Sequence, residues 1–193
     1  MPKDRIDDYP LARRSGLPAE WLFLLQKHPR ESWQDPAALG MTAAFWLERH
    51  GAFRQLGQAL QDDLAAFREG RRSAEDFQGP FARRLQVFLG ELHGHHQVED
   101  FHYFPAFRQA EPRLTPGFDL LDRDHQTLHA GLMATAEAAN ALLQALGRDP
   151  NAAETPLARY AEASGELLTG MLRHLDDEED LVIPLLIERG EPG

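Results

Sequence analysis

Two segments of the chain repeat one pattern, His-x3-Glu-x5-Pro. The first begins at His95 and the second at His174, and a further histidine pair, His50 and His129, is separated by the same 79 residues (50 to 129, 95 to 174). Residues four apart on a helix lie on one face, so each repeat can direct an imidazole nitrogen and a carboxylate to a common point. The repeat therefore predicts a pseudo-symmetric metal site built from helices.

Composition limits both the class of protein and the kind of site. The 193 residues are 42% hydrophobic and 26% charged, which suits one domain with a packed core. A net charge of −11 argues against binding to nucleic acid or to an anionic membrane. The absence of cysteine excludes disulfides, iron–sulfur clusters and thiolate zinc sites. No secretory signal or membrane-spanning apolar run is evident, so we expect a cytoplasmic protein.

Residues 1–40, which we call the arm, differ in composition from the rest of the chain. They are rich in proline, arginine and aspartate, with one short apolar stretch at residues 21–25. We expect a short helix after Pro18, with aromatic residues that pack on the main body or on a partner. The second arrangement would give a homodimer formed through the arm. The main domain is expected to span residues 41–190.

Four long amphipathic patterns follow the arm, at residues 41–69, 73–110, 116–146 and 156–189. Ser73 and the Thr-Pro pairs at 115–116 and 155–156 suit helix starts, and Gly147 suits a helix end. Pro105 is expected to kink or stop the second helix. No strand pattern is sustained, and the connections are short. The sequence therefore predicts an all-α fold, an up-down-up-down antiparallel four-helix bundle.

Each predicted helix carries at least one metal-ligating side chain. The candidate ligands are His50, His95, Glu99, His125, His129, His174 and Glu178. Five imidazoles and two carboxylates exceed the needs of one ordinary site, so we expect two metal ions with carboxylates between them. Imidazole and carboxylate without thiolate suit iron, with zinc or manganese as substitutes.

Other polar and aromatic residues near these ligands receive structural interpretations. His93, His96 and His102 are expected off the ligand face, on the surface or behind a ligand. Around the pair His174 and Glu178 the chain has further acidic residues, Asp176, Asp177, Glu179 and Asp180. They are expected to form a solvated face, although one of them could orient a ligand imidazole. The remaining large apolar residues near the ligands are expected in the core: Phe45, Trp46, Phe101, Phe104, Leu128 and Leu132.

The ordered set of motifs resembles the hemerythrin-like (HHE cation-binding) family over about residues 41–189. The motifs that carry the resemblance are Glu48-Arg49-His50, His95 to Asp100 with Phe104-Pro105, Asp124 to His129, and His174 to Glu178 with Ile183-Pro184. The arm lies outside the family pattern.

The resemblance implies a di-iron centre with unequal coordination. One iron would be held by His125, His129 and His174. The other would be held by His50 and His95, which leaves a position open for dioxygen. Glu99 and Glu178 would bridge the irons together with an oxo or hydroxo group. Oxygen-carrying hemerythrins place the last carboxylate one residue later, at the position of Glu179, whereas the internal repeat favours Glu178.

Two functions fit this centre. A ligand set rich in neutral imidazole favours reversible binding of dioxygen, or of another small diatomic molecule, for storage, delivery or sensing. The alternative is a di-iron enzyme of oxidative or nitrosative stress defence, acting on peroxide or nitric oxide. We expect a metal- and oxygen-binding protein rather than an enzyme, and we assign no catalytic residue.

Overall fold

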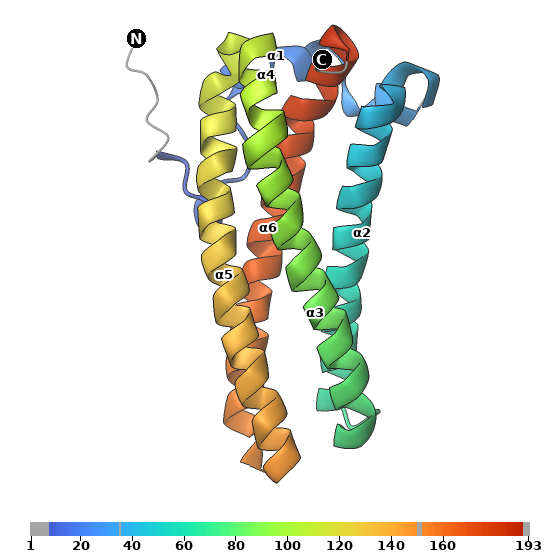
Figure 1. Cartoon of the computed structure of the whole chain (residues 1–193), viewed down its shortest axis with the longest axis vertical. Coiled ribbons are helices and arrows are strands. Elements are labelled where there is room, and N and C mark those ends of the chain that lie inside the picture. The colour runs from blue at the N-terminus through green and yellow to red at the C-terminus, as the bar shows by residue number, and fades with distance from the viewer. Residues whose placement is uncertain (1–7, 35, 150–151, 191–193) are drawn as a thin grey trace. The chain divides into compact units, whose positions relative to one another are not determined.

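The computed structural model describes residues 8–34, 36–149 and 152–190. Every regular element in these ranges is a helix, and they contain no strand (Figure 1). The all-α prediction is therefore confirmed. Within the same ranges, no helix combines the length and the apolar character that crossing a membrane requires.

The four long helices are α2 (Pro36–Arg68), α3 (Ala74–Val98), α5 (Thr115–Arg148) and α6 (Glu154–Arg189). The described part of the arm contains η2 (Leu11–Arg13), η3 (Ala19–Trp21), α1 (Phe23–Lys27) and η4 (Arg30–Gln34). Between α3 and α5 lie η5 (Glu99–Tyr103), α4 (Phe104–Ala110) and η6 (Pro112–Leu114).

The helix predicted over residues 73–110 is not continuous. It consists of α3, the π-helical turn η5 and α4, with Pro105 in the first turn of α4. Proline has no N–H to donate and its ring crowds the preceding turn, so a wider turn before it accommodates the ring. The predicted irregularity at Pro105 is confirmed, and its form is a π turn that carries Glu99.

Helix ends follow local chemistry at most of the predicted positions. Ser73 caps α3, because its Oγ accepts a hydrogen bond from the N–H of Asp76 at 3.1 Å. Gly70 and Gly190 have φ values of 69° and 78°, which suit the glycines that follow α2 and α6. Gly40, at φ 71°, interrupts the helical conformation within α2, where the arm meets the main domain. The helix expected over residues 116–146 extends to Arg148, so the expectation that Gly147 lies at its exit is wrong.

The chain divides into two compact units, and each contains parts of α2, α3, α5 and α6. The first unit is formed by Met1–Gly51, His96–Thr127 and Gly170–Gly193, and the second by Ala52–His95 and Leu128–Thr169.

The core of the first unit includes apolar residues of the arm. Trp21, Leu24 and Trp33 are buried in the same cluster as Trp46 of α2 and Phe104 of α4. The aromatic residues of the arm therefore pack on the chain's own main body, one of the two arrangements that the sequence allowed.

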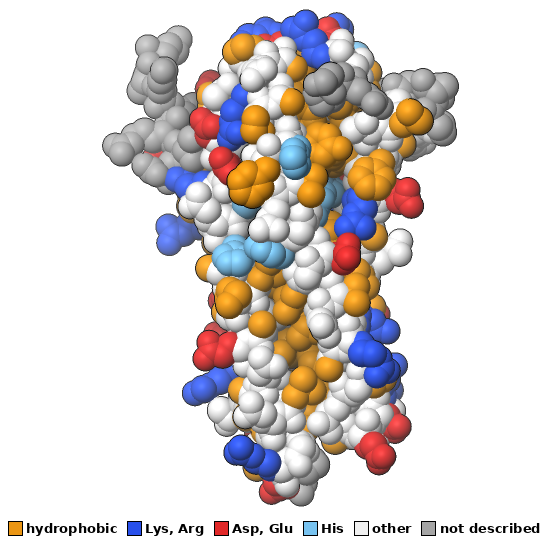
Figure 2. All heavy atoms as spheres, in the orientation of Figure 1, with side chains coloured by type: hydrophobic (Ala, Val, Ile, Leu, Met, Phe, Trp, Pro, Cys, Tyr) orange, Lys and Arg blue, Asp and Glu red, His pale blue; other side chains and the backbone are white. Residues whose placement is uncertain are grey.

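Two residues predicted for the core are on the surface. Phe45 is 55% exposed and Phe101 is 74% exposed, so the prediction was wrong for both. Consecutive helical residues point about 100° apart, and it is Trp46, next to Phe45, that faces the core. Figure 2 shows hydrophobic side chains among polar ones on the face drawn there. The other four residues predicted for the core are buried: Trp46, Phe104, Leu128 and Leu132.

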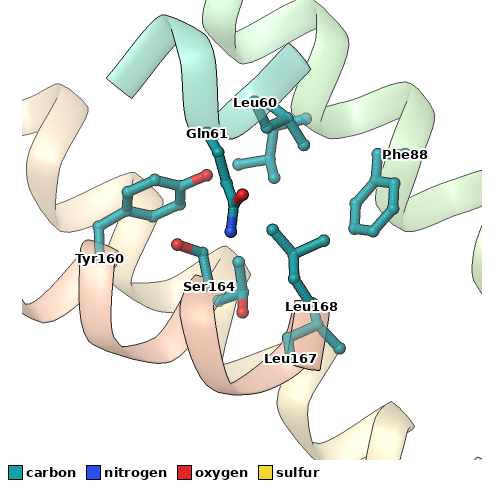
Figure 3. Close-up of a pocket in the computed structure, with 9 residues that line it drawn as sticks. Leu60, Gln61, Phe88, Tyr160, Ser164, Leu167 and Leu168 are labelled. Atoms are coloured by element: carbon teal, nitrogen blue, oxygen red, sulfur yellow. The ribbon is translucent and has the colours of Figure 1, made fainter. Parts of the chain in front are cut away.

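The second unit is held together by aromatic packing. Phe77 stacks on Phe67 and on Phe81, with ring centroids 4.6 and 4.5 Å apart, and Tyr160 meets Phe81 edge-on at 5.0 Å. A small cavity lies beside Tyr160 and Ser164 (Figure 3). The volume of this cavity is about 10 Å³, which is room for about one water molecule.

Candidate metal centre

Five of the predicted ligands come together in the first unit. α2 supplies His50, η5 supplies Glu99, α5 supplies His125, and α6 supplies both His174 and Glu178. Their exposed fractions lie between 0% and 4%. Burial of charged or titratable groups in an apolar core is costly unless they pair or bind a cation.

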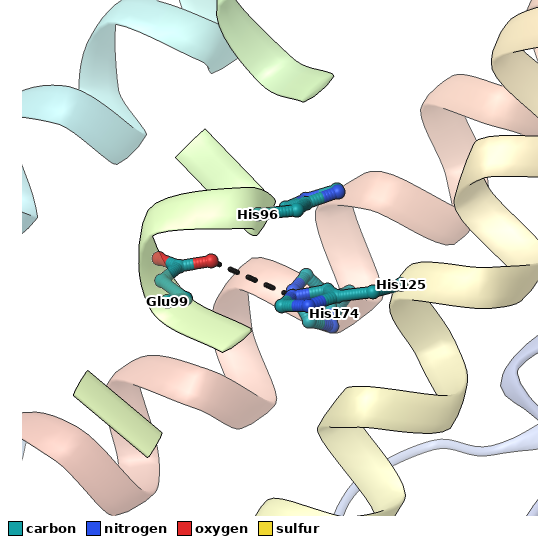
Figure 4. A group of neighbouring side chains, drawn as sticks. All are labelled: His96, Glu99, His125 and His174. Atoms are coloured by element: carbon teal, nitrogen blue, oxygen red, sulfur yellow. Dashed lines mark hydrogen bonds and ion pairs between the residues drawn. The ribbon is translucent and has the colours of Figure 1, made fainter. Parts of the chain in front are cut away.

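Four side chains lie close together, and the ring of His96 lies over that of His125 (Figure 4). His96, Glu99, His125 and His174 each offer a ligand atom, and these atoms lie within 4.8 Å of one another. The Nε2 atoms of His125 and His174 are 3.0 Å apart, and His125 Nε2 is 3.4 Å from Glu99 Oε2. This group of three imidazoles and one carboxylate could hold a metal ion.

Glu178 lies between two of the histidines. Its Oε2 is 3.4 Å from His174 Nε2 and 3.5 Å from His50 Nε2. His50, Glu99 and Glu178 also place ligand atoms within 4.8 Å of one another. Glu99 thus belongs to both groups, and Glu178 contacts a histidine of each. Two carboxylates in these positions can join two metal ions.

Three of these histidines, His50, His125 and His174, have their Nδ1 atoms close to a further carboxylate. The Nδ1 contacts are 3.0 Å from His50 to Glu179 Oε1, 2.6 Å from His125 to Asp100 Oδ1, and 3.5 Å from His174 to Asp124 Oδ2. An imidazole that donates its Nδ1–H to a carboxylate keeps a lone pair on Nε2 for a metal. At His50 and His125 the outer carboxylates therefore fix both the ring orientation and the tautomer that a metal ion needs, whereas the longer contact of His174 is an ion pair without a hydrogen bond.

The buried charges shift the pKa values of the cluster. Burial raises the pKa of Glu99 well above its usual range, and the neighbouring Glu178 charge raises it further. Burial also lowers the pKa of His125. Burial alone would lower the pKa of His174, but its contacts with Asp124 and Glu178 outweigh this and raise it to about 9. Without a cation, Glu99 and His174 therefore keep their protons to a higher pH than usual.

Two predicted ligands belong to the second unit. His95 is the last residue of that unit's part of α3, is half-buried, and has its ring 5.0 Å from that of Phe53. His129 is exposed, with its ring 5.0 Å from that of His93, and Figure 2 shows histidines at the surface. The ligand groups found among the described residues do not include His129. His125 and His129 are four residues apart, and they would share an ion only if both rings turned toward it. His125 instead directs its Nε2 to His174.

His96 is a candidate ligand that the sequence analysis left out of the ligand set. It is 4% exposed, and its ring stacks on that of His125 with centroids 4.1 Å apart and an interplanar angle of 12°. Of the two positions expected for it, on the surface or behind a ligand, the surface position is wrong. A signal was available, because His96 and Glu99 are three residues apart, a spacing that also shares a helix face.

The acidic run on α6 is more buried than predicted. Asp177 and Glu179 are 0% and 3% exposed, so the solvated-face interpretation is wrong for these two residues. Glu179 instead hydrogen-bonds to His50, as the alternative of an orienting acid allowed. Glu178, not Glu179, lies with the ligand atoms of His50 and His174.

Comparison with known proteins gives one match. The family model for the hemerythrin HHE cation-binding domain matches residues 41–186. No curated protein and no solved structure matched the chain. The matched segment begins directly after Gly40 and contains every residue of the cluster, and it leaves the arm outside.

Proposed function

Because the chain belongs to the hemerythrin HHE cation-binding family, we propose that its buried histidine and glutamate cluster holds two iron ions and binds dioxygen. The observation that carries this proposal is the convergence of three buried imidazole Nε2 atoms on two buried carboxylates, each imidazole being backed by another carboxylate. A solvated or purely structural histidine has no need of that paired arrangement.

The donor atoms fit a metal ion in spacing and in charge. The Nε2 atoms of His125 and His174 are 3.0 Å apart, close enough for both to bind one metal ion. Glu99 and Glu178 bring two carboxylates into an apolar interior, where a pair of cations would offset their repulsion. Nitrogen and oxygen donors without thiolate suit iron, zinc and manganese.

We assign the ligands as follows. One ion would be held by His125 and His174 with His96, which takes the place expected for His129. The second would be held by His50 and by His95, which is one helical turn before Glu99 on the same stretch of chain. The two glutamates, Glu99 and Glu178, would bridge.

The surrounding side chains orient the ligands and exclude water. Trp46 donates its indole N–H to Glu178 Oε1 at 3.1 Å, which fixes that carboxylate. Phe104 stacks against His125 with ring centroids 5.3 Å apart, and it is fully buried. Ferrous ions held here would supply the electrons for dioxygen binding, and the apolar wall that Trp46 and Phe104 form would keep water out and slow irreversible oxidation. This arrangement supports storage, delivery or sensing of dioxygen.

We propose the antiparallel up-down-up-down bundle for the matched domain on the same grounds. Each compact unit contains parts of all four long helices, and short connections join them in chain order. A homodimer formed through the arm stays a prediction, which sedimentation equilibrium would test.

The optical spectrum of the protein loaded anaerobically with ferrous iron tests this function. We expect a charge-transfer band that develops in air and fades under argon through several cycles, and that His174→Ala lacks. Permanent conversion to a ferric spectrum in a single exposure to air would contradict reversible binding. Turnover of peroxide or nitric oxide well above that of free iron would then support the stress-defence enzyme.

A further inference from the structure

The arm carries two arginines that reach the carboxylates behind the metal-ligand histidines. The first is Arg14, whose guanidinium is buried although the residue lies outside the matched domain. Its Nε donates to Asp177 Oδ2 at 2.7 Å, and its two Nη atoms donate to the two oxygens of Asp124. Such a forked contact fixes the plane of a carboxylate, which a single point charge cannot do.

Asp124 lies between Arg14 and a proposed ligand, His174. Its Oδ2 accepts from Arg14 on one side and lies 3.5 Å from His174 Nδ1 on the other. The arm is held in this position by further contacts: Arg14 donates to the Tyr9 carbonyl at 3.0 Å, and Arg173 of α6 donates to the Ser15 carbonyl at 3.1 Å. The arm therefore fixes the carboxylate of Asp124, which lies against the ring of His174.

Arg30 repeats the arrangement at another histidine. Its Nη1 donates to Glu179 Oε2 at 3.0 Å, and the other oxygen of Glu179 is 3.0 Å from His50 Nδ1. Arg30 also donates to Asp180 Oδ1 at 2.7 Å and to the Asp176 carbonyl at 2.8 Å.

The Arg30 side chain is itself held in place. Its guanidinium lies 4.9 Å from the ring centroid of Trp33, and the Trp33 indole N–H donates to the His28 carbonyl at 3.0 Å. Since Trp33 is buried in the core of the first unit, the arm presents Arg30 from a packed position.

We propose that the arm is a part of the metal centre, in which Arg14 and Arg30 are positioning residues that hold His174 and His50 through Asp124 and Glu179. This inference rests on the proposed function. It adds a role for a segment that the family match does not cover, and it assigns the same role to two arginines 16 positions apart.

This arrangement couples two events, docking of the arm and binding of metal. If docking of the arm raises metal affinity, metal binding must stabilise the docked arm by the same factor. Metal binding then reduces the fraction of time that the arm is undocked and exposed, and a partner that binds the exposed arm would respond to this change.

Paired variants test the proposal with cobalt(II) as a spectroscopic probe, titrated anaerobically against a competing chelator. Arg14→Gln and Arg30→Gln remove the positioning contacts. Arg13→Gln is the matched control for Arg14, because Arg13 is its exposed neighbour. Lys27→Gln is the control for Arg30, because Lys27 forms an exposed arm-to-α6 ion pair with Glu188 at 2.6 Å, away from the cluster.

We expect each positioning variant to bind cobalt about 10- to 100-fold more weakly, with an altered ligand-field spectrum, and each control to stay within about twofold of the wild type. Arg14→Lys should fall between, since it keeps the charge and loses the fork. Hydrogen exchange should show that metal slows exchange in residues 11–34 of the wild-type protein, and slows it less in the positioning variants.

The outcomes separate this inference from the proposed function. If the wild-type protein binds no cobalt at the cluster, the proposed function fails. If the wild type binds two ions and both positioning variants bind them with unchanged affinity and spectrum, the arm is only a structural cover and the inference is overturned. Should Arg14→Gln fail to fold, Arg30→Gln and Arg14→Lys decide the question, because the Arg30 side chain is 41% exposed and Arg14→Lys leaves no buried charge uncompensated.

Discussion

The metal-free protein should lose stability as the pH rises, and His174 sets the size of the effect. The pKa of this histidine is about 9 in the folded chain, against an ordinary value of 6.5. A histidine whose pKa is higher in the folded state stabilises the fold fully below pH 6.5, and this stabilisation is lost as the pH rises through about 9. Since His174 is fully buried, solvent screens the effect little.

The magnitude follows from the difference between the two pKa values. Each pKa unit corresponds to about 1.4 kcal/mol, so His174 contributes about 3 kcal/mol between pH 6.5 and pH 9. Glu99 changes stability in the same direction, because its pKa is also raised in the fold. His125, whose pKa is lowered, acts in the opposite direction but below its unfolded value, outside this range.

Urea unfolding of the chelator-treated protein at a series of pH values measures this effect. We expect the free energy of unfolding to fall by about 3 kcal/mol more in the wild type than in His174→Gln between pH 6.5 and pH 9. Metal loading should remove the difference, because the ion replaces the proton on Nε2. Equal pH slopes for the two metal-free proteins would refute the reasoning.

Other side chains of the centre give distinct expectations. Glu99→Gln should raise the unfolding free energy of the metal-free protein at pH 8, since a neutral amide replaces a carboxyl group whose ionisation is disfavoured by burial and by Glu178, and elemental analysis should find fewer than two ions per chain. Phe104→Ala should cost about 3–5 kcal/mol in urea unfolding and speed oxidation of the ferrous protein in air. Trp46→Phe should cost about 2 kcal/mol, because a hydrogen bond to a charged group is lost. Phe45→Ala, on the exposed side of the same helix, should change stability by less than about 0.5 kcal/mol.

Most of the fold follows from local patterns. Helix spacing, proline and glycine predict the four long helices, because these signals act within a few residues. The π turn at Glu99–Tyr103 was expected only as an irregularity near Pro105, since sequence does not determine how a helix accommodates a proline. Such turns are frequent at functional sites, and this one carries a proposed bridging ligand.

The candidate site was predictable where its geometry is local to one helix. The pair His174 and Glu178 is an example, because its i and i+4 spacing fixes the shared face. The choice between His96 and His129 depends instead on which way His125 turns, and that is decided by contacts between helices. Arg14 was beyond sequence reasoning, because its carboxylate partners lie 110 and 163 residues away in the chain.

Metal stoichiometry tests the central claim most directly. The protein should be stripped with chelator, loaded anaerobically with excess ferrous iron, freed of unbound metal, and assayed for iron and protein on the same sample. The account predicts two iron ions per chain for the wild type and fewer than two for His174→Ala. A wild-type protein that retains no iron, or a His174→Ala protein that retains two ions, would contradict it.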